Sequence, residues 1–278
     1  MIALSLTIIL NTIFFVVFKE FAKRNINTHQ AITFNYLTAA LIALYIGGAN
    51  SNVINLNNTD WFYATILFGA LFIIMFNIMA ITTQKLGISI SSMASKMSLI
   101  IPVIGAVIFH NASIDSYKVA GIIIAITAVY LTFKKSGSTA KPTLAIILFF
   151  GAGILDMCLD LIRNNYLSST IDFNLFITTA FLTAFSLGLL KVIWDGEKIL
   201  RKNIVAGIVL GVPNYFSIYF VLLALENLGG IYVFPILNIG VVLFSAIISW
   251  LFYQEQMSKT NWIGIVLACL SIFIILWN

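Results

Sequence analysis

Charged residues are scarce in this sequence. They make up 9% of its 278 residues, and hydrophobic residues make up 61%, with a mean hydropathy of +1.05. Soluble domains carry about 25% charged residues. The composition therefore excludes a domain that folds in water and indicates that nearly the whole chain lies in a membrane.

Signatures of cofactor and metal chemistry are missing as well. The chain has two cysteines, both inside apolar stretches, and it lacks the P-loop, His-Glu-x-x-His and Gly-x-Ser-x-Gly patterns. We therefore predict no cofactor, no metal ion, no ATP-driven step and no enzymatic activity of these classes.

Apolar windows of about 20 residues recur along the chain, and each could cross about 30 Å as a helix. They predict an all-α polytopic membrane protein with ten transmembrane helices. The expected spans are 2–20, 31–49, 61–83, 88–109, 117–133, 142–164, 172–193, 203–225, 230–252 and 260–277.

Basic residues follow the odd-numbered spans, so with ten crossings they gather on one side of the membrane. The twelve residues are Lys19, Lys23, Arg24, Lys85, Lys134, Lys135, Lys141, Lys191, Lys198, Arg201, Lys202 and Lys259. Because cytoplasmic loops carry the excess of Lys and Arg, both chain ends are predicted on the non-cytoplasmic side. These loops account for the net charge of +5, so no nucleic-acid partner is expected.

Weak internal similarity suggests that the chain contains two copies of one unit. The matched pairs are Phe34-Asn35 with Phe173-Asn174, Gly69 with Gly211, Leu86-Gly87 with Leu228-Gly229, and Gly121 with Gly264. Five crossings per copy would turn the second copy upside down, which is a recurrent transporter design. Chance alignment of low-complexity helices is the alternative.

The second half carries Ala224-Leu225-Glu226-Asn227-Leu228-Gly229, then Glu255 and Trp262-Ile263-Gly264. With Pro102-Val103 and Gly121 in the first half, the chain resembles the EamA-like ten-helix branch of the drug/metabolite transporter superfamily. It departs from that family in the ninth span, where Phe244 stands in place of a frequent proline and Pro235 comes earlier. The resemblance implies two repeats, 1–135 and 141–278, around a shared cavity. It also implies an inner-membrane carrier that often exports amino acids or other small metabolites.

Four charges fall inside or at the end of apolar spans, where each costs at least roughly 2.5–3.5 kcal/mol. Asp156, Asp160 and Arg163 share one stripe of the sixth span, because they are spaced i, i+4 and i+7. Lys96 lies at a similar depth in the fourth span and is a candidate partner for Asp156. The four charges form either a structural ion-pair network or a site that binds a zwitterionic substrate or takes up a proton.

Further polar residues are candidates for lining the cavity. Pro213 is predicted to interrupt the eighth span, and Pro235 the ninth. The candidates near these breaks and at matching depths are Asn11, Asn77, Tyr215, Tyr219 and Asn238. Serines precede Lys96 and serve either helix packing or cavity lining. Glu255 is expected to be a solvated carboxylate at a helix end.

An intramembrane magnesium-dependent transferase is the alternative from another class, because Asp156 and Asp160 form an Asp-x-x-x-Asp pattern. A second acidic motif is absent, and so few carboxylates make a poor magnesium site. A multidrug or cation efflux carrier is the alternative within transport. The expected partners are therefore a small-molecule substrate and the lipid bilayer, and the sequence defines neither the substrate nor an oligomeric state.

Overall fold

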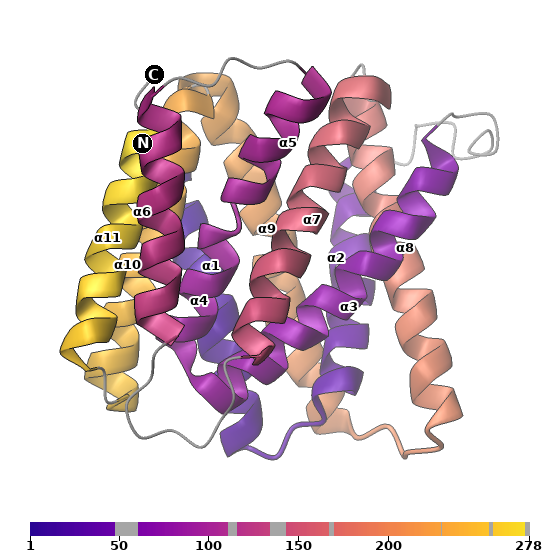
Figure 1. The fold of residues 1–278 in the computed structure, drawn as a ribbon. Helices are drawn as coiled ribbons and strands as arrows, with labels where there is room; N and C mark the ends of the chain where they lie inside the picture. Colours follow the sequence, from indigo (N-terminus) through magenta and orange to yellow (C-terminus); the bar gives the residue numbers. More distant parts are fainter. Residues whose placement is uncertain are drawn as a thin grey trace. The chain divides into compact units, whose positions relative to one another are not determined.

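The structure is a computed structural model that describes residues 1–47, 61–110, 116–133, 143–166, 170–228, 230–255 and 258–275. In these ranges the regular elements are α-helices (Figure 1). They are α1 (Ile2–Lys23), α2 (Thr28–Gly47), α3 (Phe62–Leu86), α4 (Ile88–Met97), α5 (Ile100–His110), α6 (Ser116–Phe133), α7 (Thr143–Tyr166), α8 (Thr170–Trp194), α9 (Arg201–Leu228), α10 (Gly230–Tyr253) and α11 (Lys259–Ile275).

Within the described residues, seven segments are long and apolar enough to cross a membrane, with α4 and α5 taken together. They are Ile2–Lys23, Phe62–Leu86, Ile88–Gly105, Thr143–Ile162, Phe173–Trp194, Arg201–Leu225 and Ile236–Tyr253. Large apolar side chains such as Tyr45 and Trp194 point outward, with 89% and 91% of their surface exposed. Helices make all their backbone hydrogen bonds internally, so helices with apolar side chains on the outside are stable in the hydrocarbon of a bilayer. The chain is an all-helical, multi-pass membrane protein.

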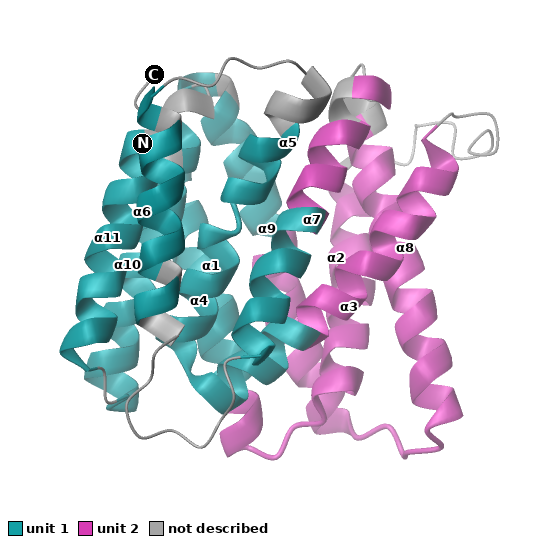
Figure 2. Cartoon of the chain, in the orientation of Figure 1, with its two compact units in different colours: residues 1–19, 78–154, 216–278 teal, residues 20–77, 155–215 magenta. Residues whose placement is uncertain are grey.

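Two compact units make up the chain (Figure 2). Unit 1 comprises residues 1–19, 78–154 and 216–278, and unit 2 comprises residues 20–77 and 155–215. Each unit therefore combines segments from both halves of the sequence. Because a compact unit and a sequence repeat are different divisions of the chain, the predicted repeat boundaries stay a prediction.

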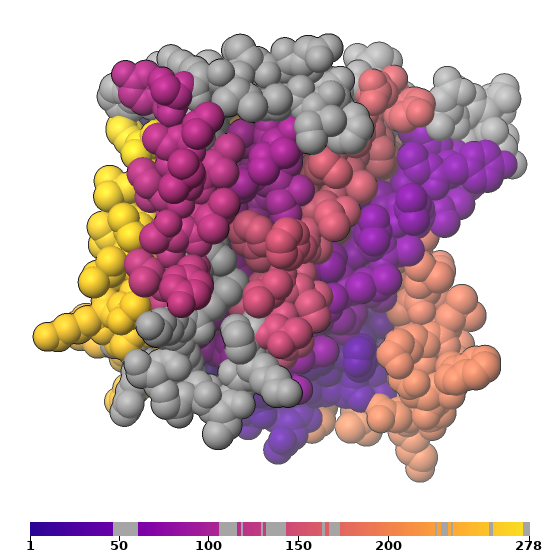
Figure 3. All heavy atoms as spheres, viewed as in Figure 1, coloured from indigo at the N-terminus to yellow at the C-terminus, as the bar shows by residue number. Residues whose placement is uncertain are grey.

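In unit 1, α6 packs against α11 and α4 packs against α10. The side chains of α6 and α11 lie side by side in Figure 3. Fully buried alanines lie in this core, Ala125 and Ala128 on α6 and Ala268 on α11, together with Met93 and Met97 of α4. Small side chains let helices approach closely where lipid supplies no hydrophobic drive between them.

In unit 2, α2 packs against α8 around an aromatic core. Tyr36 is fully buried, and its hydroxyl donates to the Phe72 carbonyl oxygen at 3.1 Å. The rings of Phe72 and Phe181 stack with centroids 5.9 Å apart, and Tyr36 lies 5.9 Å from Phe181. The buried hydroxyl of Tyr36 thus has a partner, as a polar group in an apolar core requires.

Two glycines let helices of unit 2 touch through their backbones. A Cβ at Gly69 would lie 2.7 Å from the Ala180 carbonyl oxygen and 2.9 Å from the Cβ of Thr183. A Cβ at Gly211 would lie 2.7 Å from the Asn35 carbonyl oxygen and 2.6 Å from the Cβ of Thr38. The two contacts have the same form, because each glycine meets a carbonyl oxygen and the threonine three residues later.

The prolines act differently from the prediction. α9 runs unbroken through Pro213 and α10 through Pro235, so the expected interruptions are wrong. Near Pro213, the side-chain nitrogen of Asn214 donates to the Asn35 side-chain oxygen at 3.2 Å, and Gly211 packs on α2. α9 thus continues past a residue that lacks a backbone donor, and contacts with α2 lie on either side of it.

Replacing Gly69 or Gly211 by alanine should destabilise the protein, because overpacking a tight contact costs roughly 1–3 kcal/mol. The two losses should be similar, since the contacts have the same form. The melting temperature of the detergent-purified protein would measure both. Ser186→Ala on the exposed face of α8 serves as the control and should change little.

Candidate functional site

The fourth predicted span is broken beside its lysine. α4 ends at Met97 and α5 begins at Ile100, so the continuous helix expected over 88–109 is wrong. Pro102 lacks the N–H that would bond to the Ser98 carbonyl in an unbroken helix. That carbonyl instead accepts from the Ile101 amide at 2.9 Å. Lys96 thereby lies in the last turn of α4, where the helix dipole favours a cation.

The Lys96 ammonium is bound by a predicted site residue from another helix. Its Nζ donates to the side-chain oxygen of Asn11 on α1 at 3.1 Å. The Asn11 side-chain nitrogen donates in turn to the Thr7 carbonyl at 3.0 Å, which orients the amide. Both side chains are partly buried. The structure therefore brings together Asn11 and Lys96, a pairing that the sequence did not suggest.

The serines around Lys96 serve packing. Ser89, Ser91, Ser92 and Ser98 are buried. The hydroxyl of Ser92 donates to the Ser89 carbonyl at 3.0 Å, and that of Ser98 donates to the Ser95 carbonyl. The hydroxyl of Thr83 on α3 donates to that of Ser91 at 2.8 Å. Because these hydroxyls bond within the protein, the structure favours the packing interpretation over cavity lining.

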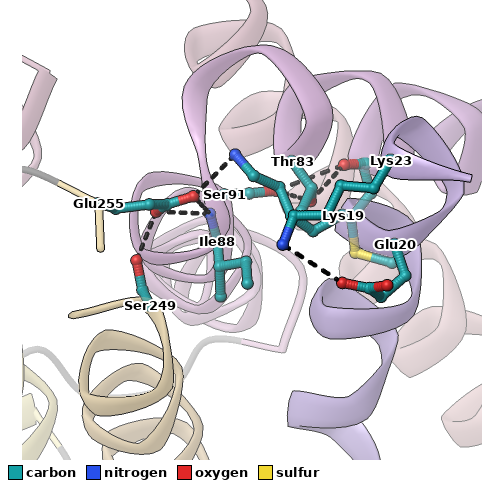
Figure 4. A network of polar contacts seen from close by, with 9 residues as sticks. Lys19, Glu20, Lys23, Thr83, Ile88, Ser91, Ser249 and Glu255 are labelled. Carbon is teal, nitrogen blue, oxygen red and sulfur yellow. Dashed lines mark hydrogen bonds and ion pairs between the residues drawn. The ribbon is translucent and has the colours of Figure 1, made fainter. Parts of the chain in front are cut away.

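Glu255 holds the other end of α4 (Figure 4). Its carboxylate oxygens accept from the Ile88 amide at 3.1 and 3.0 Å. Lys19 of α1 forms an ion pair with it at 2.9 Å, and the Ser249 hydroxyl of α10 also donates to it. Only 17% of the Glu255 side chain is exposed. The prediction of a solvated carboxylate is therefore wrong.

Local backbone geometry produces this contact. Gln254 follows α10 with a φ of 51°, a left-handed conformation that ends a helix. The Glu255 amide then donates to the Ser249 carbonyl at 3.2 Å, so the chain turns back toward α10. On the other side Gly87 has a φ of 105°, and a Cβ there would lie 2.7 Å from the Glu255 carboxyl carbon. A glycine directly before α4 was the sequence feature that could have indicated this contact, but Glu255, which contacts it, lies 168 positions later in the chain.

The acidic residues of the sixth span lie in unit 2. Asp156 and Asp160 are both on α7, so their predicted spacing along one helix is confirmed. Asp156 is exposed and Asp160 partly buried, and both have polar or electrostatic contacts. The side chain of Arg163 lies outside the described residues. Lys96 belongs to unit 1, and its pairing with Asp156 stays a prediction.

The other predicted cavity residues divide between the two units. In unit 2, Tyr215 is 8% exposed, and the side-chain oxygen of Asn77 is buried without a hydrogen-bond partner. In unit 1, Asn238 is 7% exposed, whereas Tyr219 is 41% exposed and packs edge-on against Phe220. An unsatisfied buried oxygen is costly. Asn77 therefore keeps its candidacy for binding a water or ligand, and a common cavity for these residues stays a prediction.

Metal ligands do not cluster in the part of the chain that the structure describes, because no group of three His, Cys, Asp or Glu side chains could hold an ion there. The Asp156–Asp160 pair thus lacks a third such ligand among these residues. Two carboxylates alone supply too few oxygens for a protein-held magnesium ion.

Two findings from comparison with known proteins bear on the chain. The model of the EamA-like transporter family matches residues 142–277. A protein of Haemophilus influenzae, named as an uncharacterized protein, is 29% identical in an alignment that covers 93% of this chain and 91% of that protein. The family model thus matches the second half of the chain, and the similarity to the Haemophilus protein extends over nearly the whole chain.

Gly87→Ala should destabilise the protein far more than Gly196→Ala. Both glycines have a positive φ, of 105° and 66°, but no atom lies within 4 Å of a Cβ at Gly196. A left-handed alanine costs roughly 1–2 kcal/mol at Gly196, and an alanine at Gly87 costs roughly 1–3 kcal/mol, because its φ of 105° and ψ of 167° are essentially restricted to glycine. Gly87→Ala must also displace the Glu255 carboxylate, which adds roughly 1–3 kcal/mol. Equal drops in melting temperature would contradict the tight contact between Gly87 and Glu255.

Proposed function

Because residues 142–277 match the model of the EamA-like transporter family, we propose that this chain is a secondary transporter that exports a small metabolite. The observation that carries the proposal is the break between α4 and α5 beside Lys96. Membrane transporters commonly build their substrate sites where spanning helices are discontinuous. A lysine in a membrane-spanning helix is costly, and such residues usually mark a site or a pathway.

The architecture in this proposal is ten crossings in two inverted repeats, residues 1–135 and 141–278. Three helix contacts support it. α2 packs on α8, α4 on α10 and α6 on α11. These helices belong to the second, fourth and fifth spans of the two halves, so each contact joins corresponding spans. Contacts between corresponding elements are what a two-fold relation between repeats produces.

The glycine contacts refine the alignment of the repeats. Gly69 meets Thr183 and Gly211 meets Thr38, so the threonines correspond as the glycines do. Thr183 follows Thr38 by 145 residues, and both hydroxyls donate to the carbonyl four residues earlier at 2.9 Å. In the register that these threonines suggest, the match of Phe34-Asn35 with Phe173-Asn174, at an offset of 139, is displaced by six residues.

The substrate site in the proposal contains Lys96 and Asn11, with Asp156 and Asp160 as the opposing charges. Tyr215, Tyr219, Asn77 and Asn238 complete the polar lining of a central cavity that opens to alternate sides. A zwitterionic amino acid suits these charges, because its carboxylate would meet Lys96 and its ammonium an aspartate. The structure supports the Lys96–Asn11 part of this site directly, and the sequence carries the rest.

The membrane in the proposal is a bacterial-type inner membrane, with both chain ends on the non-cytoplasmic side. The one-sided distribution of Lys and Arg supports this orientation. A cysteine introduced as Lys198→Cys should then be shielded from a membrane-impermeant thiol reagent in intact cells and become reactive after permeabilisation. Labelling of intact cells would reverse the orientation.

Three other interpretations stand beside this proposal. A cation efflux carrier would use the aspartates without Lys96, and an intramembrane transferase would use them with magnesium. The family match favours transport over transfer chemistry. A purely structural charge network is the third interpretation, and the following experiment separates it from a binding site.

Zwitterionic amino acids should raise the melting temperature of the detergent-purified protein, and Lys96→Gln and Asp156→Asn should abolish that rise. A ligand at 100 times its Kd stabilises the folded state by about 2.7 kcal/mol. Nucleosides, polyamines and cationic dyes complete the panel. Lys191→Gln and Asp195→Asn are matched controls, because they remove the same charges from an exposed ion pair. If both site variants melt much earlier yet keep the ligand shift, the network is structural.

Proton coupling would make transport depend on pH through Asp156 or Asp160. Carboxylates inside membrane-spanning helices are the groups that proton relays in transporters use. Asp156→Asn or Asp160→Asn should therefore flatten the pH dependence of transport in reconstituted vesicles. An unchanged pH profile in both variants would exclude these aspartates as the coupling groups.

A further inference from the structure

α1 and α4 are joined at two points in unit 1. At one point Lys19 of α1 binds Glu255, which in turn caps the Ile88 amide of α4. At the other point Asn11 of α1 binds Lys96 of α4. Lys19 and Asn11 are eight residues apart, and so are Ile88 and Lys96, which is about 12 Å along each helix. The two helices thus run antiparallel with the same spacing between their contacts.

The end contacts of α4 add to its packing against α10 in fixing its position. It has ten residues and is separated from α5 by the break at Ser98 and Leu99. Helices this short are marginal by themselves, and outside contacts must hold them. An anion at the N-terminus of a helix binds the first amides and complements the helix dipole. Glu255 supplies that anion with both of its oxygens on Ile88.

Glu255 is itself fixed from three other directions. Lys19 holds the charge, Ser249 donates to the carboxylate, and Gly87 leaves room for it against the backbone. A carboxylate held in this way cannot move along the helix without losing several of these bonds. It therefore defines where α4 begins, and the position of Lys96 eight residues later follows.

We infer that Glu255 is a positioning residue for Lys96: by capping α4, it sets the register of that helix against α1 and brings the Lys96 ammonium to Asn11. The contact of Glu255 with Lys19 and Ile88 is thus part of the machinery of the proposed transporter, although Glu255 itself is expected at the opposite end of α4 from the substrate. Of the two tests below, only the measurement of ligand affinity depends on the proposed function.

Methionine signals test the inference without a ligand. The chain has seven methionines, and Met93 and Met97 flank Lys96 on α4 and are fully buried. In protein labelled with [13C-methyl]methionine, Glu255→Gln should shift or broaden the signals of Met93 and Met97. The signal of Met75, in unit 2, should stay unchanged and provides the internal reference. Met→Leu variants assign the three signals.

Glu197→Gln is the matched control, because it makes the same change in a carboxylate of unit 2 that accepts from Asn27. It should leave Met93 and Met97 in place. Lys19→Gln should produce a smaller shift than Glu255→Gln, since Ile88 keeps its cap. If Met97 keeps its wild-type signal in folded Glu255→Gln protein, or shifts equally in Glu197→Gln, the inference is wrong.

A second readout separates positioning from stability. With L-alanine and L-leucine as zwitterionic probes, Glu255→Gln should weaken the apparent affinity about tenfold at a temperature where the variant remains folded. An unchanged affinity would overturn the inference. If neither probe stabilises the wild-type protein, the proposed zwitterionic substrate fails, and the Met97 signal alone decides the role of Glu255.

Discussion

The placement of one ammonium group in an apolar helix is the constraint on which unit 1 depends. Lys96 can lie there because α4 ends one residue later, so that the negative end of the helix dipole and the Asn11 oxygen meet the charge. The break that makes this possible comes from Pro102, which removes one amide donor. Because of the break, α4 is short, and a short helix needs stabilising contacts at its other end. The Glu255 carboxylate, bound by Lys19 and Ser249, makes such a contact with the N-terminus of α4. The break, the lysine and the carboxylate are therefore parts of one arrangement.

The two halves of the chain differ where this arrangement occurs. In the proposed repeat, α10 would correspond to α4 and α5 together, yet it is one continuous helix, and Phe244 stands 142 residues after Pro102. Asn238 stands at the same offset from Lys96. The halves share packing contacts of the same form at Gly69 and Gly211, but only the first half, among the described residues, has the broken helix with its cation. In the proposed carrier, the shared packing would belong to both repeats and the charged site to one of them.

Most of the fold could be predicted from the sequence, and the polar contacts could not. Nine of the ten expected spans coincide with single helices to within a few residues, because twenty-residue apolar runs have few other structures available in a bilayer. The effect of the prolines on their helices was predicted wrongly. Pro102 ends a helix that was expected to continue, and Pro213 and Pro235 lie in helices that were expected to break. Whether a proline ends a helix depends on neighbouring contacts, such as that of Asn214 with Asn35, which hydropathy does not contain.

The sequence by itself determined the membrane class, the approximate bounds of nine of the ten expected spans and the presence of charges that hydrocarbon would not tolerate unaided. Those properties follow from the transfer energies of single residues summed over short windows, so they need no knowledge of the partner helices. The tertiary structure decided which groups satisfy the charges: Asn11 for Lys96, and Lys19 with the first amide of α4 for Glu255. These partners lie 85 and 167 or more residues apart in the chain. A pairing at that separation depends on how the helices pack, and local patterns of residues do not encode it.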